Sequence, residues 1–404
     1  MSRFPAMALL FCFALTLRAA EAPLDLPGST PWDLKTLGSA PGFDWIDSKS
    51  AVRSLKYSGE RYHGHATKVF AYFATPGTLA GDATLTSDAS KDSKLPGVVL
   101  VHGGGGTAFK EWAELWARRG YAAIAMDLAG KNVGEEGGPD QDDQTKLGSI
   151  AEPVTEHWPY HAVANVIRAH SLLRSFAFVD PDRTAITGIS WGGYLTCIAA
   201  SIDSRFKAAV PVYGCGFLHE NSYWLEPRFE KMKPEDRARW VELYDPSRYL
   251  ACCRVPILFM NGTNDFAYPL DSYMKSYGLV RGAKNISVTV NMPHGHTQGW
   301  APKEIGVFID QQLLGTRPLL ALGKTRLEAG LASVELDPKF PPRAASLHFT
   351  ADAGPINKRS WTTKSARLEP QRASAELPGG AAAWFFTAGD DRDAVVSSGV
   401  TIEK

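Results

Sequence analysis

Short apolar segments alternate with longer segments of helical character, and this alternation constrains the fold more than any other feature of the sequence. The apolar segments are residues 69–76, 97–106, 121–130, 184–190, 208–214, 255–262 and 286–292. Strands that are apolar on both faces are typical of a parallel sheet covered by helices on its two sides. The sequence therefore predicts an α/β fold for residues 22–316, with a mostly parallel sheet and helices on both faces.

The pattern changes near Thr316, where helix-compatible segments stop and short alternating segments begin. Closely spaced strands without helices are typical of a β-sandwich, and GDDRD at residues 389–393 has the composition of a hairpin turn. We therefore predict a small β-sandwich domain, of the fibronectin type III or immunoglobulin type, at residues 317–404. The run Trp384–Phe386, all aromatic, leads us to expect that one face of the sandwich rests on the α/β domain.

The first residues have the composition of an export signal. Arg3 supplies a positive start, the apolar stretch 6–17 is too short to span a bilayer, and small residues follow near positions 20–22. We predict a signal peptide at residues 1–21 that is removed on export. The mature protein is then expected in the periplasm or outside the cell, without a membrane partner.

Charge and cysteine content exclude several classes of protein. Lysine plus arginine and aspartate plus glutamate both number 43, so no net field attracts nucleic acid and we predict no such partner. The cysteines beyond the signal lack the C-x-x-C spacing of metal sites, and we expect them to be small buried residues. Their pairing, if any, is left open by the sequence. They are Cys197, Cys215, Cys252 and Cys253.

The tripeptide HGH occurs twice, at residues 63–65 and 294–296. Two histidines at positions i and i+2 of a strand share one face, so two such pairs offer four ligands to a zinc ion. No carboxylate or cysteine pattern accompanies them. We therefore predict no metal and no other cofactor.

Ser190 lies in TGISWGGYL, directly after an apolar segment and before a helix-compatible one. This G-x-S-x-G pattern is that of a nucleophile elbow, in which a sharp turn presents a hydroxyl above the sheet edge. A tight turn that happens to contain serine is the alternative. The rest of the chain decides between them.

A base and an acid follow Ser190 in the order that such a nucleophile requires. A serine hydroxyl attacks only when a histidine takes its proton and a carboxylate orients that histidine. Asp265 follows the predicted strand 255–262, and His294 follows the predicted strand 286–292. Because the carboxyl ends of parallel strands meet at one edge, we predict a Ser190–His294–Asp265 triad.

Acyl transfer also requires hydrogen-bond donors for the developing oxyanion. Trp191 supplies the backbone N–H after the nucleophile, at the start of a helix where such groups are unpaired. The HGGGG segment at residues 102–106 supplies a second N–H, since glycines allow close approach of a backbone to the substrate. Gly103 and Gly104 are the candidates, with Gly104 preferred.

Four segments together, VLVHGGGG, GISWGGYL, NGTNDFAYP and PHGH, resemble the α/β-hydrolases of the acetylxylan esterase, dienelactone hydrolase and prolyl oligopeptidase-like group. The resemblance extends over residues 60–315, and the β-rich tail resembles the sandwich appended to some secreted members. It implies Ser190 as nucleophile, Asp265 as acid and His294 as base, because the family's histidine is typically followed by glycine, here Gly295. His296 is the alternative base.

A long insertion begins with YGCGFLHENSYW at residues 213–224 and lies above the predicted strand ends, where caps shape pockets. Its Tyr213 and Trp224, together with Trp158, are predicted to form an aromatic rim that binds sugar or aryl groups. Core positions are the alternative for each ring.

We therefore predict an exported serine esterase that hydrolyses acetyl or similar esters on carbohydrate through an acyl-enzyme. Its substrate is an ester-bearing small molecule or oligosaccharide, and no cofactor takes part. A serine peptidase of the prolyl oligopeptidase-like type is an alternative, because it uses the same triad. A non-catalytic carbohydrate-binding protein and a metal-dependent hydrolase are the others.

Overall fold

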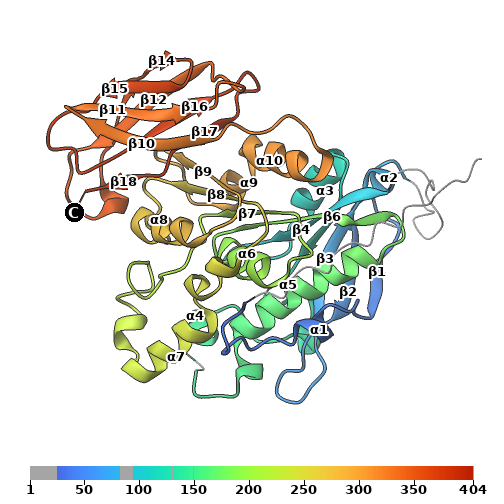
Figure 1. The fold of residues 1–404 in the computed structure, drawn as a ribbon. Helices are drawn as coiled ribbons and strands as arrows, with labels where there is room; N and C mark the ends of the chain where they lie inside the picture. Colours follow the sequence, from blue (N-terminus) through green and yellow to red (C-terminus); the bar gives the residue numbers. More distant parts are fainter. Residues whose placement is uncertain (1–24, 82–93, 129–130, 149, 404) are drawn as a thin grey trace, which may run out of the picture.

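The computed structural model describes residues 25–81, 94–128, 131–148 and 150–403, so the predicted signal peptide lies outside the described residues. An α/β region extends as far as α10 (Lys303–Leu314), and a β-rich region begins with β10 (Leu322–Glu328) (Figure 1). The predicted boundary between residues 316 and 317 falls in the segment that joins these two elements.

A large mixed sheet forms the centre of the α/β region. Its strand order is β1-β2-β3-β5-β4-β6-β7-β8-β9. The pairs β1–β2, β2–β3 and β3–β5 are antiparallel, whereas β4 to β9 are parallel to one another. The predicted α/β fold with a mostly parallel sheet is thus confirmed. The strands are β1 Phe43–Asp47, β2 Arg53–Ser58, β3 Lys68–Ala74, β4 Leu95–Val101, β5 Ala122–Met126, β6 Val179–Ile189, β7 Ala208–Val212, β8 Ile257–Gly262 and β9 Lys284–Thr289.

The sequence predicts no strand at β1 and β2, the outermost pair at one side of the sheet. β1, FDWID, alternates half-buried and exposed residues and therefore lacks a continuous apolar run. Its aromatic side chains are held by tertiary contacts: the Phe43 ring lies 5.6 Å from the Phe176 ring, and the Trp45 ring lies 5.8 Å from the Phe73 ring. Packing against distant rings, which the local pattern does not reveal, creates this strand.

Helices cover both faces of the sheet. α5 (Trp158–Ser175) and α6 (Trp191–Ile202) pack together on one face, and α3 (Lys110–Arg118) and α10 lie on the other (Figure 1). Asp310 of α10 pairs with Arg119 at the end of α3 and accepts a hydrogen bond from the Tyr121 hydroxyl at 2.6 Å. The remaining helices are α1 Leu34–Leu37, α2 Pro76–Leu79, α4 Asp143–Leu147, α7 Pro234–Tyr244, α8 Leu270–Leu279 and α9 His296–Trp300.

The composition of the helices and the state of the cysteines add two findings. Across the described ranges, no helix is both long enough and apolar enough to cross a bilayer. All the cysteines after the predicted signal carry free thiols, with Cys252 half-buried and the others buried. The expectation of small buried residues is therefore met by Cys197, Cys215 and Cys253.

The C-terminal region consists of two antiparallel sheets. One has the order β10-β11-β15-β14, and the other has the order β13-β12-β16-β17 with β18 also paired to β16. The predicted turn at residues 389–393 lies between β16 and β17. The further strands are β11 Leu331–Leu336, β12 Ala344–Thr350, β13 Thr362–Ser365, β14 Arg367–Glu369, β15 Arg372–Glu376, β16 Ala383–Gly389, β17 Val395–Ser397 and β18 Thr401–Ile402.

Strand β17 joins the C-terminal region to the edge of the large sheet. Ser287 Oγ donates to Val395 O at 2.8 Å, and the Val288 N–H donates to Ser397 Oγ at 2.9 Å. The Val395 N–H donates in turn to the buried Glu304 of α10 at 2.6 Å. The edge strand β9 is therefore covered, as exposed sheet edges in stable proteins usually are.

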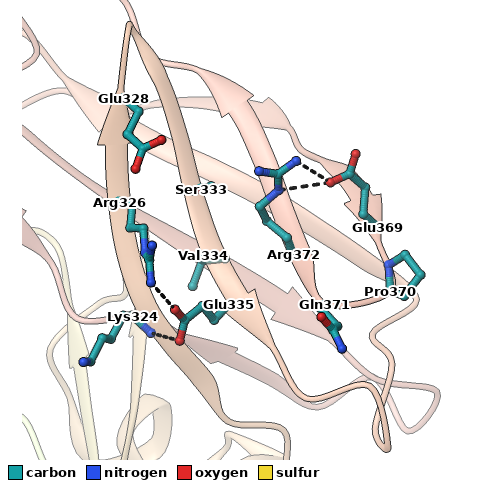
Figure 2. A pocket seen from close by; sticks show the side chains of 10 residues that line it. All are labelled: Lys324, Arg326, Glu328, Ser333, Val334, Glu335, Glu369, Pro370, Gln371 and Arg372. Atoms are coloured by element: carbon teal, nitrogen blue, oxygen red, sulfur yellow. Dashed lines mark hydrogen bonds and ion pairs between the residues drawn. The ribbon is translucent and has the colours of Figure 1, made fainter.

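A groove of about 710 Å³ lies on the outward face of β10, β11 and β15 (Figure 2). Four of its charged side chains are paired across strands: Arg326 with Glu335 at 3.0 Å, and Arg372 with Glu369 at 2.7 Å. No aromatic side chain lines it. Because sugar rings in proteins commonly stack on aromatic faces, this groove gives the carbohydrate-binding alternative no specific support.

Removal of residues 317–404 should leave an α/β region that folds, because Ser190, Asp265 and His294 all precede the cut. The truncation exposes the backbone of β9 and the carboxylate of Glu304, so we expect a lower melting temperature and lower solubility. We expect kcat on a small aryl acetate to stay within roughly tenfold of the full-length value, about 1.4 kcal/mol in barrier. A truncated protein that is folded by circular dichroism but inactive would show that the C-terminal region helps to build the site.

Candidate active site

Ser190 occupies a strained turn between β6 and α6. Its φ of 58° and ψ of −117° are rare for a residue with a side chain. A Cβ at Gly192 would clash with the Val101 carbonyl oxygen, and one at Gly188 would clash with the carbonyl of Gly192. Only glycines therefore allow β4, β6 and α6 to approach this closely. The G-x-S-x-G pattern is required by packing, and it lifts Ser190 above the sheet edge.

Asp265 and His294 form a direct hydrogen bond. Asp265 follows β8 and His294 follows β9, and His294 Nδ1 lies 2.7 Å from Asp265 Oδ2. The other carboxylate oxygen of Asp265 accepts the backbone N–H groups of Ala267 at 2.9 Å and Tyr268 at 2.8 Å. Asp265 is fully buried, so these donors fix its orientation. The arrangement holds the His294 ring with Nδ1 toward the acid and Nε2 on the opposite side of the ring.

Backbone pairing links Ser190 to this pair through the end of β7. The Ser190 N–H donates to Val212 O at 2.9 Å, at the end of the neighbouring strand β7. The next residue along, Tyr213, stacks on the His294 ring at 4.4 Å and donates its hydroxyl to Pro293 O at 2.7 Å. The predicted nucleophile, acid and base thus lie at the carboxyl ends of β6, β8 and β9, which is the usual place for chemistry in such sheets.

The two histidines of the second HGH segment have different partners. His296 Nε2 accepts the Gly103 N–H at 2.9 Å, whereas His294 contacts Asp265. Burial lowers the pKa of His296 to about 4, so its ring is neutral at pH 7 and acts as an acceptor. The alternative assignment of His296 as the base is therefore disfavoured, because its Nε2 is already occupied.

His296 instead fixes the HGGGG loop. The Gly103 peptide is held from both sides, since its carbonyl oxygen accepts from His102 Nδ1 at 2.8 Å. The Gly103 N–H is thus committed to His296. The next residue, Gly104, lies against Trp191: a Cβ there would be 2.9 Å from Trp191 Cδ1. Gly103 also lies at the Ser190 turn, since a Cβ there would be 3.0 Å from Ser190 Cβ. Of the two predicted loop donors, Gly104 is the one whose N–H is not engaged by His296.

The predicted aromatic rim of Tyr213, Trp224 and Trp158 is wrong as an open surface. All three side chains are buried, Trp158 with 0% exposure and Trp224 with 5%. Trp158 begins α5 inside the protein, where its Nε1 donates to Leu128 O at 3.1 Å. The sequence could not show this, because a large aromatic side chain suits the core and the rim equally.

The structure places other rings at the surface of the site. Phe266, next to Asp265, is 52% exposed and its ring lies 5.0 Å from the His294 ring. Tyr223, next to Trp224, is 54% exposed and contacts Phe266 edge to face at 5.8 Å. Both were missed. For Phe266 a signal was available in the sequence, since it directly follows the predicted acid Asp265 and should lie at the same sheet edge.

Two polar groups near Ser190 were also missed. The Tyr268 side chain is buried near Ser190, and burial raises the pKa of its phenol. Lys146 Nζ lies 4.9 Å from the centre of the Trp191 ring, as in a cation–π contact.

Among residues that the structure describes, no cluster of three or more histidine, cysteine or acidic side chains has the arrangement of a metal site.

Comparison with known proteins gives two family matches that overlap on the chain. The acetyl xylan esterase family (AXE1) matches residues 51–222, which contain HGGGG and Ser190. That of the prolyl oligopeptidase family matches residues 149–307, which contain Ser190, Asp265 and His294. Together the two matches cover the α/β region from β2 to α10.

Individual relatives likewise include a peptidase and acetyl xylan esterases by name. Dipeptidyl aminopeptidase BIII of Pseudoxanthomonas mexicana is 25% identical over 252 residues, a match that spans 56% of this chain but only 33% of that relative's length. The acetyl xylan esterase of Paenibacillus sp. R4 has a TM-score of 0.55 and 21% identity, covering 69% of this chain and 92% of its own. Acetyl xylan esterase 1 of Thermoanaerobacterium sp. JW/SL YS485 has a TM-score of 0.51 and 17% identity. This similarity covers 71% of this chain and 94% of that one.

Substitution of the two histidines should separate their roles. We expect His294→Ala to abolish inactivation by a fluorophosphonate, because no base would remain for Ser190. His296→Ala should slow inactivation by up to about 10²-fold, the cost of one misplaced oxyanion donor. His296→Gln, whose side-chain oxygen can accept the Gly103 N–H, should restore most of the rate. Loss of all inactivation in His296→Ala with a rate near wild type in His294→Ala would reverse the assignment.

Proposed function

We propose, from the premise that the chain is an α/β-hydrolase of the acetyl xylan esterase and prolyl oligopeptidase group, that it is a serine esterase acting on carboxylic esters of carbohydrates. The observation that carries the proposal is the strained Ser190 turn beside the hydrogen-bonded pair Asp265–His294. A strained turn persists only where surrounding packing holds it, and such turns concentrate at functional sites.

The proposed reaction follows from the orientation of His294. Asp265 accepts the hydrogen bond from Nδ1–H, so the lone pair of Nε2 is available for the Ser190 hydroxyl proton. As that proton moves to Nε2, Ser190 Oγ forms a bond to the ester carbonyl carbon. The bond from that carbon to the alkoxide oxygen then breaks, and His294 returns the proton to the leaving alcohol. Water repeats the same steps on the acyl-enzyme and releases the acid.

The oxyanion of each tetrahedral intermediate is assigned to two backbone donors. The Trp191 N–H lies at the start of α6, where the helix has no acceptor for it and the helix dipole favours negative charge. The Gly104 N–H is the second donor, from the loop that His296 fixes. Preorganised donors of this kind contribute about 3–4 kcal/mol each to transition-state stabilisation.

Two lines of support favour a carbohydrate ester as substrate. Both solved structures described above are acetyl xylan esterases by name, and each is covered by this chain over more than nine-tenths of its length. The predicted export of the mature protein, which rests on residues 1–21 alone, would place it where polysaccharide fragments occur. We propose an acetyl or similarly small acyl group.

A peptidase is the second candidate, and one observation favours it. The prolyl oligopeptidase family match is the one that contains Asp265 and His294, and the curated relative is a dipeptidyl aminopeptidase by name. The same triad cleaves esters and amides. The substrate therefore has to be measured.

Ser190→Ala should remove nearly all turnover and leave the fold intact. The matched control is Ser201→Ala, which removes a buried hydroxyl from the same helix α6, where it donates to Cys197 O at 2.6 Å. We expect the control to lower the melting temperature slightly and to keep kcat. Ester hydrolysis by Ser190→Ala at the wild-type rate would refute the assignment of the nucleophile.

Asp265→Asn should lower kcat by about 10⁴-fold, since the amide favours the wrong tautomer of His294. Asp310→Asn is the control, because this carboxylate on α10 pairs with Arg119 and Tyr121 and contacts none of the proposed triad residues among the contacts described. The control should lose stability and keep activity. An Asp265→Asn variant with unchanged kcat would mean that another carboxylate orients the base.

The choice between esterase and peptidase can be made with purified wild-type protein. We expect kcat/KM on acetylated xylo-oligosaccharides and 4-nitrophenyl acetate to exceed that on aminoacyl and prolyl 4-nitroanilides by at least about 10²-fold, or about 2.7 kcal/mol. The ratio in the opposite direction would establish the peptidase.

A further inference from the structure

Five aromatic rings form a closed circuit of contacts that includes His294. Trp224 contacts Tyr223 at 5.7 Å, Tyr223 contacts Phe266 at 5.8 Å, and Phe266 contacts His294 at 5.0 Å. The circuit closes through Tyr268, which lies parallel to His294 at 6.4 Å and contacts Trp224 at 5.4 Å. Trp224 also packs on Trp191, at 4.6 Å between ring centres, and so ties the circuit to the nucleophile turn.

The members of this circuit differ sharply in exposure. Trp224 and Tyr268 are buried and serve as its base, whereas Phe266 is 52% exposed and Tyr223 is 54% exposed. Removing a large aromatic side chain from water lowers the free energy. Phe266 and Tyr223 stay exposed in the free protein, so a bound molecule that covers their rings would be favoured. Their backbones are also joined, since the Tyr223 N–H donates to Ala267 O at 3.2 Å. The pair is therefore a preformed apolar surface held by the insertion and the acid loop together.

The position of Phe266 decides which part of the substrate this surface meets. In the proposed reaction His294 gives its proton to the leaving alkoxide oxygen, so the alcohol part of the ester lies next to the His294 ring. Phe266 is the exposed ring in contact with His294. The oxyanion donors, Trp191 and Gly104, belong to the other loops, after β6 and β4. The exposed pair thus borders the alcohol rather than the carbonyl oxygen.

We propose that Phe266 and Tyr223 bind the alcohol part of the ester, and that this alcohol carries a ring, aromatic or pyranose, that stacks on them. The inference rests on the proposed esterase function and adds to it the side of the substrate that determines specificity. Aryl rings and the C–H faces of sugar rings offer the same flat apolar surface.

The test compares acetate esters that differ only in the alcohol: 2-naphthyl acetate, acetylated xylobiose and ethyl acetate. The measured quantity is the ratio of kcat/KM for each cyclic alcohol to kcat/KM for ethyl acetate. We expect Phe266→Ala to lower this ratio roughly five- to tenfold, the equivalent of one lost stacking contact. Tyr223→Ala should lower it less, because Tyr223 is farther from His294 along the circuit.

Further variants separate stacking from general disruption. Phe266→Trp keeps a ring and should retain the ratio, whereas Phe266→Leu keeps bulk without a ring and should lose most of it. Ile46→Ala is the control: Ile46, in β1, is 54% exposed and lies on the strand at the far side of the sheet from β8 and β9. We expect this substitution to leave kcat/KM for all three esters unchanged.

Each outcome bears on the proposal. A loss confined to 2-naphthyl acetate assigns an aromatic alcohol, and a loss confined to acetylated xylobiose assigns a sugar. An unchanged ratio in Phe266→Ala overturns the proposal, and so does a loss that follows acyl length when acetyl and butyryl esters of one alcohol are compared. Absence of ester hydrolysis by the wild-type protein would refute the proposed function itself, and is distinguishable because it appears before any variant is made.

Discussion

The contact on which the site depends is the close approach of three backbones around Ser190. A side chain at Gly192 would strike the Val101 carbonyl, and one at Gly188 would strike Gly192, so β4, β6 and α6 meet at a separation that only glycine allows. This packing holds Ser190 at a positive φ that the residue would not adopt alone. The unfavourable conformation of this turn is offset by the burial of the apolar strands β4 and β7 on either side of β6.

From that turn outward, each component of the site is held in place by hydrogen bonds or ring stacking. Asp265 is fixed by two backbone donors, His294 by Asp265 and by stacking on Tyr213, and the glycine loop by His296. Hydrogen bonds and stacking of this kind remove the entropy cost of ordering the groups during reaction. A neutral His296 is essential to the scheme, because a protonated ring cannot accept the Gly103 N–H.

Much of this could be predicted from the sequence. The parallel strands could be predicted because they are apolar on both faces. Ser190, Asp265 and His294 were proposed as site residues because each follows a predicted strand. The sequence could not place Trp158 and Trp224, because burial of an aromatic residue depends on what packs above it. It missed β1, whose rings are held by Phe73 and Phe176, and it left the role of His296 open. These features depend on contacts between residues far apart in the chain, which local patterns do not encode.

The central claim is that Ser190 carries the acyl group during turnover, and trapping the intermediate tests it most directly. The wild-type protein is mixed with excess 4-nitrophenyl acetate, quenched in acid within milliseconds and digested for peptide mass mapping. Our account predicts one acetyl group per molecule on the peptide that contains Ser190, no such group in Ser190→Ala, and a burst of nitrophenol equal to the enzyme concentration. Acetyl groups on another residue, or turnover without any acylated peptide, would contradict it.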